Sequence, residues 1–240
     1  MPPKKQPTAE KATDVTARRR EGQSSMCVCV GGYYSQQRRE LSNPTAATPN
    51  WSTHTRRISD NLSIVSVGGY AHIFDDTKSL EAPFVVSSAR SGNVVCSTAF
   101  SPDGKLLATG DEVGCIRMWD PTEKAAPREL YSILDAYTAD SSVNAMSFVN
   151  DGSILATGGS DGAVKMWRVG TDRLQLLHTE SLGSCVWSTV FSCDGRMLAC
   201  SANDGSIALL QVGSWKMLHS WHFEAVGSVS FSPDGNVLAC

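Results

Sequence analysis

Residues 100–110 read FSPDGKLLATG, and the chain ends on a near-copy of this stretch, FSPDGNVLAC, at 231–240. Two further versions lie between them and begin at Phe148 and Phe191. The four phenylalanines, from Phe100 to Phe231, are spaced by 48, 43 and 40 residues, which is the range of repeat architectures. The stretch is therefore one part of a unit that the chain uses several times.

Each unit has the same internal order. A short apolar run such as VNAMSF precedes a turn with Pro, Asn or Asp and then Gly, which accepts the positive φ that such turns need. A second run (SILAT), a Gly/Asp/Asn turn (GGSDG), an alternating run (AVKMW) and a fourth run (RLQLLHT) follow. Residues 60–240 show no amphipathic helical period. The sequence therefore predicts an all-β fold built from units of four short strands.

Two tryptophans close the third run of successive units, as Trp119-Asp120 and Trp167-Arg168. Together with FSPDG and LATGGSDG, these residues resemble the WD40 repeat family over roughly residues 60–240. The resemblance implies a β-propeller whose blades are four-stranded sheets. We expect a disordered basic tail at 1–25, a degenerate partial blade and loop at 26–60, and the propeller at 61–240, with about four complete blades and partial ones.

The last unit stops after its second predicted strand. Propellers usually need about 4 to 8 blades to close and hide their sheet edges. We therefore expect a fragment, a truncated reading frame, or an arc that another chain completes.

The resemblance also implies a hydrogen-bond network inside each blade. In WD40 proteins, an Asp after the second strand commonly joins a Ser/Thr of that strand, the Trp of the third strand and a preceding His. Here Leu210 stands at one Trp position and Val113 at one Asp position, so no blade has the full set. The structural positions assigned by the resemblance are Trp119, Asp120, Thr157, Asp161, Trp167, Asp204 and His222.

WD40 proteins commonly use the rim loops between blades to bind peptides. The loop LDAYTADSS at 134–142 is long and acidic, and it lies between a fourth and a first strand. An acidic, aromatic rim would favour a basic peptide. The residues that we expect to contact a partner are Asp111, Glu112, Tyr137, Asp140, Trp187 and Trp221.

One segment matches a catalytic motif. Residues 158–162, GGSDG, fit the G-x-S-x-G nucleophile elbow, which needs a helix after the serine. The alternating run AVKMW follows instead, so we expect a blade turn and keep a hydrolase using Ser160 as an alternative. The sequence has no C-x-x-C pair and no nucleotide-binding glycine motif, and we expect no catalytic residue, metal or cofactor.

Charge is unevenly distributed along the chain. Residues 1–60 hold ten Lys/Arg and five Asp/Glu, whereas the remainder holds eleven and nineteen. Only the tail, with Arg18-Arg19-Arg20, could attract nucleic acid electrostatically. The eight cysteines lie mostly in apolar runs, and no secretory signal is evident, which favours reduced thiols inside the cell, in cytoplasm or nucleus. Ser59 follows two arginines and resembles a kinase site, although a strand-connecting turn is the simpler interpretation.

These observations predict a non-catalytic interaction scaffold that binds protein partners, a basic peptide among them, through rim loops. The alternative is an RNA- or chromatin-associated subunit that binds through its basic tail. No stretch approaches the roughly 18 apolar residues of a transmembrane helix, so we expect no membrane association.

Overall fold

The computed structural model describes residues 93–122, 127–138 and 140–240, together with the backbone of residues 54–56, 62–67, 70–75 and 84–87. The predicted tail at 1–25, most of the predicted partial blade at 26–60 and the turn that contains Ser59 lie outside the described residues.

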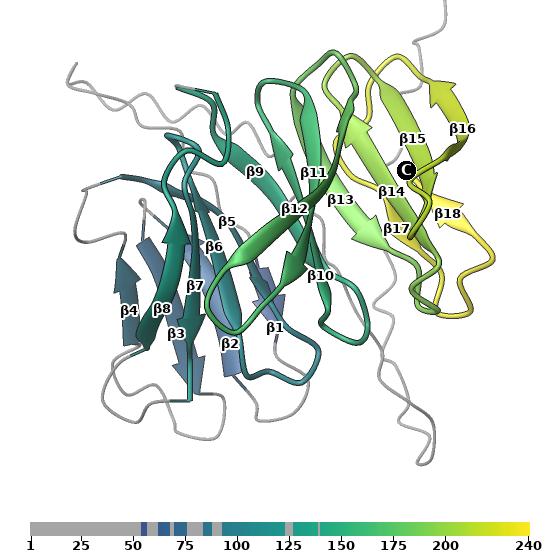
Figure 1. Cartoon of the computed structure of the whole chain (residues 1–240). Helices are drawn as coiled ribbons and strands as arrows, with labels where there is room; N and C mark the ends of the chain where they lie inside the picture. The colour runs from purple at the N-terminus through teal and green to yellow at the C-terminus, as the bar shows by residue number, and fades with distance from the viewer. Residues whose placement is uncertain are drawn as a thin grey trace, which may run out of the picture.

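The regular elements of the described part are all β-strands (Figure 1). They form four four-stranded antiparallel sheets and one two-stranded sheet. The first sheet contains β1 (His54–Arg56), β2 (Leu62–Val67), β3 (Tyr70–Asp75) and β4 (Phe84–Ser87). The second contains β5 (Val95–Phe100), β6 (Leu107–Asp111), β7 (Ile116–Asp120) and β8 (Arg128–Ile133). The third contains β9 (Val143–Phe148), β10 (Ile154–Gly159), β11 (Ala163–Val169) and β12 (Leu174–Ser181). The fourth contains β13 (Val186–Phe191), β14 (Met197–Ala202), β15 (Ser206–Gln211) and β16 (Met217–His222), and the last pairs β17 (Ser230–Phe231) with β18 (Leu238–Ala239).

The sheets are the blades of a β-propeller, as the repeat predicted. Within each sheet the strands are paired in chain order, and the first strands β5, β9 and β13 lie next to one another (Figure 1). The turns between first and second strands therefore share one end of the blades with the turns between third and fourth strands. The turns between second and third strands share the opposite end with the loops that connect blades. We call these the lower and upper faces, following Figure 1.

The repeated FSPDG stretch is the turn between the first and second strands. Ser101 Oγ donates to Asp103 Oδ1 at 2.6 Å and accepts from Leu106 N at 2.9 Å, so the hydroxyl links the turn to the next strand. Gly104 has φ 69°, a left-handed conformation that glycine adopts at little cost. Ser192 and Ser232 repeat these contacts in later blades. This shared chemistry explains why the stretch is the most recognisable part of the repeat.

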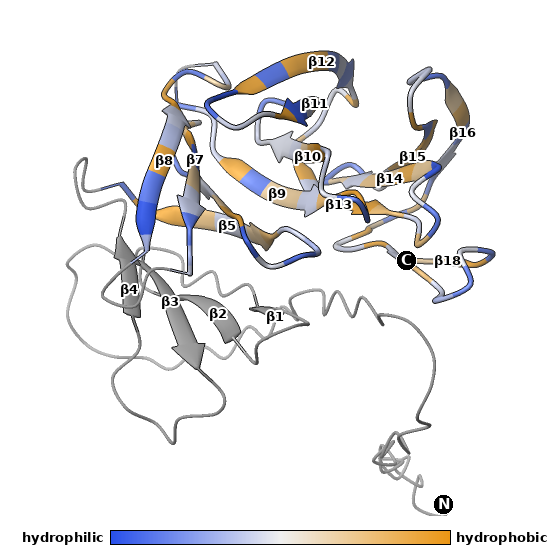
Figure 2. Ribbon diagram, turned by 60° about the horizontal axis from the view of Figure 1, so that its bottom comes forward, coloured by the Kyte–Doolittle hydropathy of each residue, from blue (hydrophilic) through white to orange (hydrophobic). Residues whose placement is uncertain are grey.

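Apolar cores lie between neighbouring sheets. Ile116 and Met118 of β7 pack in one cluster with Leu155 and Trp167 of the next sheet. Glycine in the second strand lets the sheets approach closely. A Cβ on Gly158 would lie only 2.4 Å from Val186 Cγ1 of the next sheet, which leaves no room for a side chain there. Figure 2 shows the gradient across a blade, with inner strand β5 largely apolar and outer strand β8 largely hydrophilic. The inner strand β5 is accordingly almost fully buried, whereas the outer strand β8 is half-buried to exposed.

Candidate functional site

Tryptophan–threonine pairs are formed in two blades, at the Trp167 and Thr157 positions that the resemblance assigned and at Trp119 with Thr109, where the resemblance assigned only the tryptophan. Trp167 Nε1 donates to Thr157 Oγ1 at 2.9 Å, and both side chains are buried. Trp119 Nε1 makes the same bond, also 2.9 Å long, to Thr109 Oγ1. Each bond satisfies an indole N–H that burial would otherwise leave without a partner. The pair thus joins the second and third strands through side chains as well as backbone.

Tyr137 lies in the core, in contrast to the exposed rim position expected for it. Its side chain is 4% exposed, and its hydroxyl lies 2.7 Å from Thr157 Oγ1. The ring fits because Gly159 has no side chain, since a Cβ there would lie 2.4 Å from the ring. Burial raises the pKa of the Tyr137 phenol, so it stays protonated as a hydrogen-bonding group. The phenol is thereby a polar partner of Thr157 that the resemblance did not assign.

A cation also holds the same loop. Lys165 Nζ donates to the carbonyl of Ala136 and lies 4.5 Å from the centroid of the Tyr137 ring. The contact to the ring is a cation–π interaction. Lys165 lies on β11, directly opposite Thr157 of the neighbouring strand β10. The loop at 134–142 is therefore anchored to the blade by a tyrosine and a lysine together.

Asp161 contacts the loop rather than the tryptophan pair. Its carboxylate accepts from Ala163 N at 3.0 Å and from Thr138 Oγ1 at 3.3 Å. Thr138 Oγ1 also bonds Ser141 Oγ at 2.7 Å. Of the three positions assigned to this blade, the structure therefore joins Thr157 to Trp167 and places Asp161 at the exposed turn.

Asp111 is a buried turn anchor, although it was expected on the exposed rim. It is 3% exposed, and its Oδ1 accepts from Cys115 N at 2.8 Å and from Val113 N at 3.2 Å. Its Oδ2 lies 3.9 Å from Nη2 of the buried Arg117, which occupies the position of Lys165 in the next blade. The adjacent Glu112 is exposed, and its Oε1 accepts from Val94 N at 3.1 Å. Arg117 was not identified from the sequence. A charged residue within the largely apolar third strand could have indicated a buried ion pair.

In the blade of β13–β16 the polar pair is replaced by apolar atoms. Cys200 and Leu210 stand where Thr157 and Trp167 stand in the preceding blade, and both are fully buried. Burial raises the pKa of the Cys200 thiol. Asp204 accepts from Ser206 N at 3.0 Å and from Ser206 Oγ at 2.7 Å, so it closes its own turn.

The remaining expected residues lie apart from one another. Trp187 is half-buried, and its Nε1 donates to Asn203 Oδ1 at 3.1 Å. Trp221 is 41% exposed on β16 and stacks on His219, with centroids 5.5 Å apart. His222 ends the same exposed strand. Asp120, at the end of β7, accepts from Thr122 N at 2.9 Å and so closes a turn on the lower face.

The described part of the upper face carries exposed carboxylates without basic side chains. Asp140 is exposed in the loop after β8, with φ 65°. The described turns and loops of this face, at 111–115, 134–138, 140–142, 160–162, 182–185, 203–205 and 223–228, contain no Lys or Arg. Their exposed acidic residues are Glu112, Asp135, Asp140, Asp161, Asp204 and Glu224.

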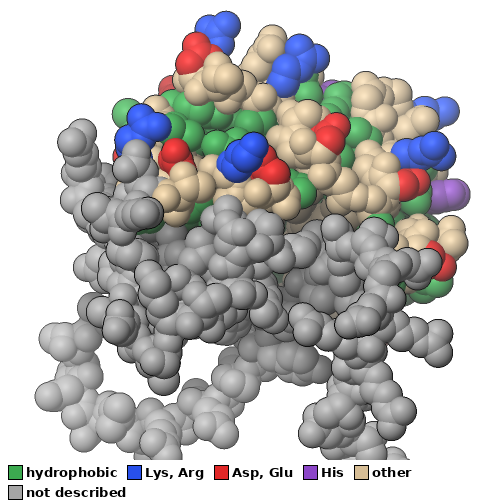
Figure 3. Space-filling model, turned by 90° about the horizontal axis from the view of Figure 1, so that it is seen from below, with side chains coloured by type: hydrophobic (Ala, Val, Ile, Leu, Met, Phe, Trp, Pro, Cys, Tyr) green, Lys and Arg blue, Asp and Glu red, His purple; other side chains and the backbone are tan. Residues whose placement is uncertain are grey.

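The lower face carries charges of both signs. Lys105 lies 3.8 Å from Asp103, Arg196 lies 3.8 Å from Asp194, and Arg128 lies near Asp120. Figure 3 shows this face, with Lys/Arg and Asp/Glu side chains interspersed over its described part. The lower face is therefore mixed in charge, whereas the described turns and loops of the upper face carry acidic side chains without Lys or Arg.

The geometry of the G-x-S-x-G segment differs from that of a nucleophile elbow. Gly158–Gly159 ends strand β10, and strand β11 begins at Ala163, so a strand rather than a helix follows Ser160. Ser160 Oγ accepts from Ser142 N at 2.9 Å and thereby connects the loop to the turn. The hydrolase alternative therefore lacks the strand–turn–helix geometry on which it depends.

The part of the chain that the structure describes has neither a cluster of metal ligands nor a membrane-spanning helix. Within these residues, no three His, Cys, Asp or Glu side chains gather as metal ligands. Nor does this part contain a helix long and apolar enough to cross a membrane. The basic tail, on which the nucleic-acid alternative depends, lies outside the described residues.

The repeats match a known family. The model of the WD domain, G-beta repeat, matches residues 83–120, 128–168 and 174–209. The chain belongs to the WD40 repeat family. Each match begins at or beside the outer strand of one sheet and ends within or at the close of the third strand of the next, so each WD40 repeat ties two blades together.

The fold also matches solved structures. A chain of the "Crystal Structure of Mitotic Checkpoint Complex" superposes with a TM-score of 0.63 at 21% sequence identity. The match covers 74% of this chain and 55% of that one, so this WD40 chain spans about half the length of the solved relative. At this identity the likeness shows the fold. No curated protein sequence matches the chain at a significant level.

Proposed function

We propose that this WD40 chain is a non-catalytic scaffold that binds a basic segment of a partner protein on its upper face. The observation that carries the proposal is that the described turns and loops of this face carry exposed carboxylates and no Lys or Arg. A uniformly acidic face steers basic partners and rejects acidic ones. Family membership supports a scaffold, because a rigid ring of blades presents many variable loops on one surface.

The buried anchors give the face a defined shape. Tyr137 and Lys165 hold the loop at 134–142 against its blade, and the Asp111 carboxylate holds the turn that presents Glu112. A preorganised loop loses less conformational entropy on binding than a free one. Six described cysteines are free thiols, which supports action in a reducing compartment.

The test is titration of the full chain with a fluorescein-labelled peptide of sequence Gly-Arg-Lys-Ser-Arg-Lys-Gly. The variant Asp135→Asn/Asp140→Asn removes two exposed upper-face charges, and Asn tolerates the positive φ at Asp140. Glu129→Gln/Asp172→Asn removes two exposed charges elsewhere and is the matched control. We expect the upper-face variant to weaken binding roughly two- to thirtyfold, with the control within about twofold.

Salt gives a second readout. Binding through exposed charges should weaken as ionic strength rises, because the Debye length falls to about 8 Å at physiological salt. Equal effects of the two variants would contradict the proposal, as would binding of a Gly-Glu-Asp-Ser-Glu-Asp-Gly peptide with the same affinity.

A further inference from the structure

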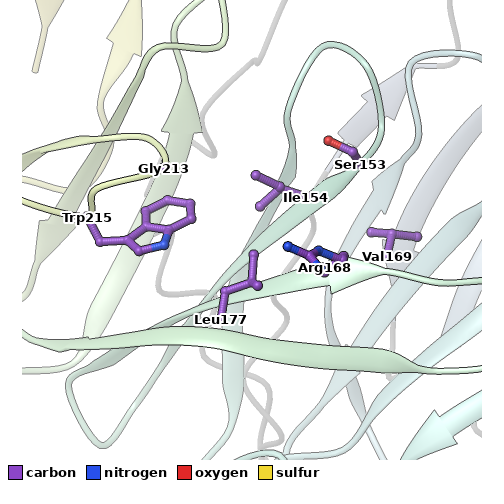
Figure 4. A pocket seen from close by; sticks show the side chains of 7 residues that line it. All are labelled: Ser153, Ile154, Arg168, Val169, Leu177, Gly213 and Trp215. Atoms are coloured by element: carbon purple, nitrogen blue, oxygen red, sulfur yellow. The ribbon is translucent and has the colours of Figure 1, made fainter.

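A cavity of about 420 Å³ lies between the third and fourth sheets, away from the acidic loops (Figure 4). Ile154 of β10 and Leu177 of β12 contribute apolar side chains, and Trp215 contributes an indole from the turn after β15. Arg168 of β11 is the one charged residue that lines the cavity. Gly213, which has no side chain, also lines it, next to Trp215. An apolar hollow with one convergent charge has the composition of a ligand site.

Trp215 is held toward this cavity by an unusual backbone conformation. It has φ 55°, in the left-handed region that Gly or Asn normally supplies. Its N–H donates to the carbonyl of Gln211 at 2.8 Å, which closes the turn between β15 and β16. The indole stacks on His178 of β12, with centroids 6.3 Å apart and planes 12° from parallel. The structure thus keeps a large aromatic side chain at a position where the backbone favours glycine.

Arg168 supplies the charge. Its side chain is exposed, and no ion pair to it occurs among the described residues. It pairs in register with Ile154 on one side and Gln175 on the other, so the guanidinium and the apolar wall share one sheet face. A guanidinium is weakly hydrated and binds carboxylates in a bidentate way. The ligand that complements the cavity therefore combines an apolar side chain with a carboxylate.

The cavity borders the open edge of a sheet. Strand β12 pairs only with β11 in the described structure, so the backbone groups on its outer side have no strand partner there. Leu177 lies on this strand. Peptides recognise such edges by adding a strand, and alternate side chains then point to the same face. Residues i and i+2 of an added strand would enter the cavity together.

We propose that this cavity binds an extended peptide segment of a partner protein in which a large apolar residue and an Asp or Glu are two positions apart. The apolar side chain packs between Trp215 and Leu177, and the carboxylate pairs with Arg168. The site is separate from the acidic upper face and takes a ligand of opposite charge. It does not depend on the function proposed for that face.

The test uses the full chain and the fluorescein-labelled peptide Gly-Ser-Leu-Ser-Glu-Ser-Gly, together with its reversed-order form Gly-Ser-Glu-Ser-Leu-Ser-Gly. Fluorescence anisotropy should show saturable binding of at least one of them below about 1 mM. Replacing Leu by Ala or Glu by Gln in the peptide that binds should each weaken it at least fivefold. Absence of saturable binding by both orders would overturn the proposal.

Two protein variants test the contacts. Arg168→Gln should weaken the Glu peptide at least fivefold and leave the Gln peptide unchanged, whereas Arg173→Gln, at an exposed arginine that does not line the cavity, should change neither. Equal effects of the two arginine variants would overturn the assignment of the carboxylate.

Trp215→Gly tests the apolar contact. Glycine accepts the positive φ, but the indole also packs on the core cluster beside it, so the thermal midpoint should fall; at a temperature where the variant remains folded, binding of the Leu peptide should fall at least fivefold. Trp221→Ala, at an exposed tryptophan of the same sheet outside the cavity, is the matched control and should bind like the parent chain. Unchanged binding by Trp215→Gly would overturn the assignment of the apolar contact.

Discussion

The hydroxyl of Tyr137 lies 2.7 Å from Thr157 Oγ1, beneath the loop that connects two blades. The same threonine oxygen accepts the indole N–H of Trp167 at 2.9 Å. One hydroxyl therefore joins a loop, a second strand and a third strand. Because all three side chains are buried, each hydrogen bond replaces a contact with water that is no longer available.

Tyr137→Phe should lower the free energy of unfolding by about 1 kcal/mol, because one buried hydrogen bond is lost while Thr157 keeps Trp167. Urea denaturation measures the change. Tyr131→Phe is the control, since the Tyr131 hydroxyl bonds the Gly170 carbonyl at 2.9 Å in a solvent-accessible position. It should cost no more than about 0.5 kcal/mol. A larger loss for Tyr131→Phe than for Tyr137→Phe would contradict the role of the buried phenol.

The sequence predicted the strands and turns of the blades because each follows from local chemistry. The serine–aspartate turns need only residues within the turn and the strand beside it, as at Ser101 and Asp103. The pairing of Trp167 with Thr157 was implied by the family pattern and depends on neighbouring strands of one sheet.

The placement of Tyr137 and Asp111 could not be predicted in this way. Tyr137 is buried because Gly159, more than twenty residues away, leaves room for its ring. Asp111 turns inward because Arg117 and two backbone N–H groups are there to receive its charge. Both residues occur in acidic loop segments, whose composition alone favours exposure. The contacts that decide their burial come from other elements.

Removing a buried hydroxyl should have opposite effects at two sites. Thr157→Val leaves the Trp167 N–H and the Tyr137 hydroxyl without this partner, and should cost roughly 2–4 kcal/mol. Ser201 Oγ is fully buried and has no hydrogen-bond partner among the residues that the structure describes, so Ser201→Ala should be neutral or stabilising by about 1 kcal/mol. Denaturant titrations of both variants measure the change in the free energy of unfolding. A substantial loss for Ser201→Ala would show that its hydroxyl is satisfied in solution.

Stability should fall in acid because of the repeated turns. In the folded chain, the Ser192 hydroxyl and then the Arg196 N–H lower the pKa of Asp194 below its ordinary value of 3.8. A carboxylate whose pKa is lower when folded stabilises the fold above its unfolded pKa. This contribution is lost as pH falls through 3.8 toward the folded pKa.

Asp194→Asn should therefore be less stable than the parent chain at pH 6, and the two should converge below about pH 3. Urea midpoints between pH 2.5 and 6 measure the difference. Asp172→Asn changes an exposed carboxylate that has no serine partner among the described residues, and should parallel the parent throughout. A constant difference between Asp194→Asn and the parent at every pH would contradict the assignment.

The cysteines should differ widely in reactivity in the native chain. The thiolate is the reactive form, and burial raises the pKa of Cys200, which is fully enclosed, and that of Cys96 to about 12. Cys240 is exposed. Alkylation with iodoacetamide at pH 7.5, followed by peptide mass mapping, should modify Cys240 before the other described cysteines, and Cys200 only at urea concentrations that unfold the chain. If Cys200 reacted in buffer as fast as Cys240, the sheet that contains β14 would have to open well below the global transition, and the apolar replacement of the Thr–Trp pair would not be a stable core.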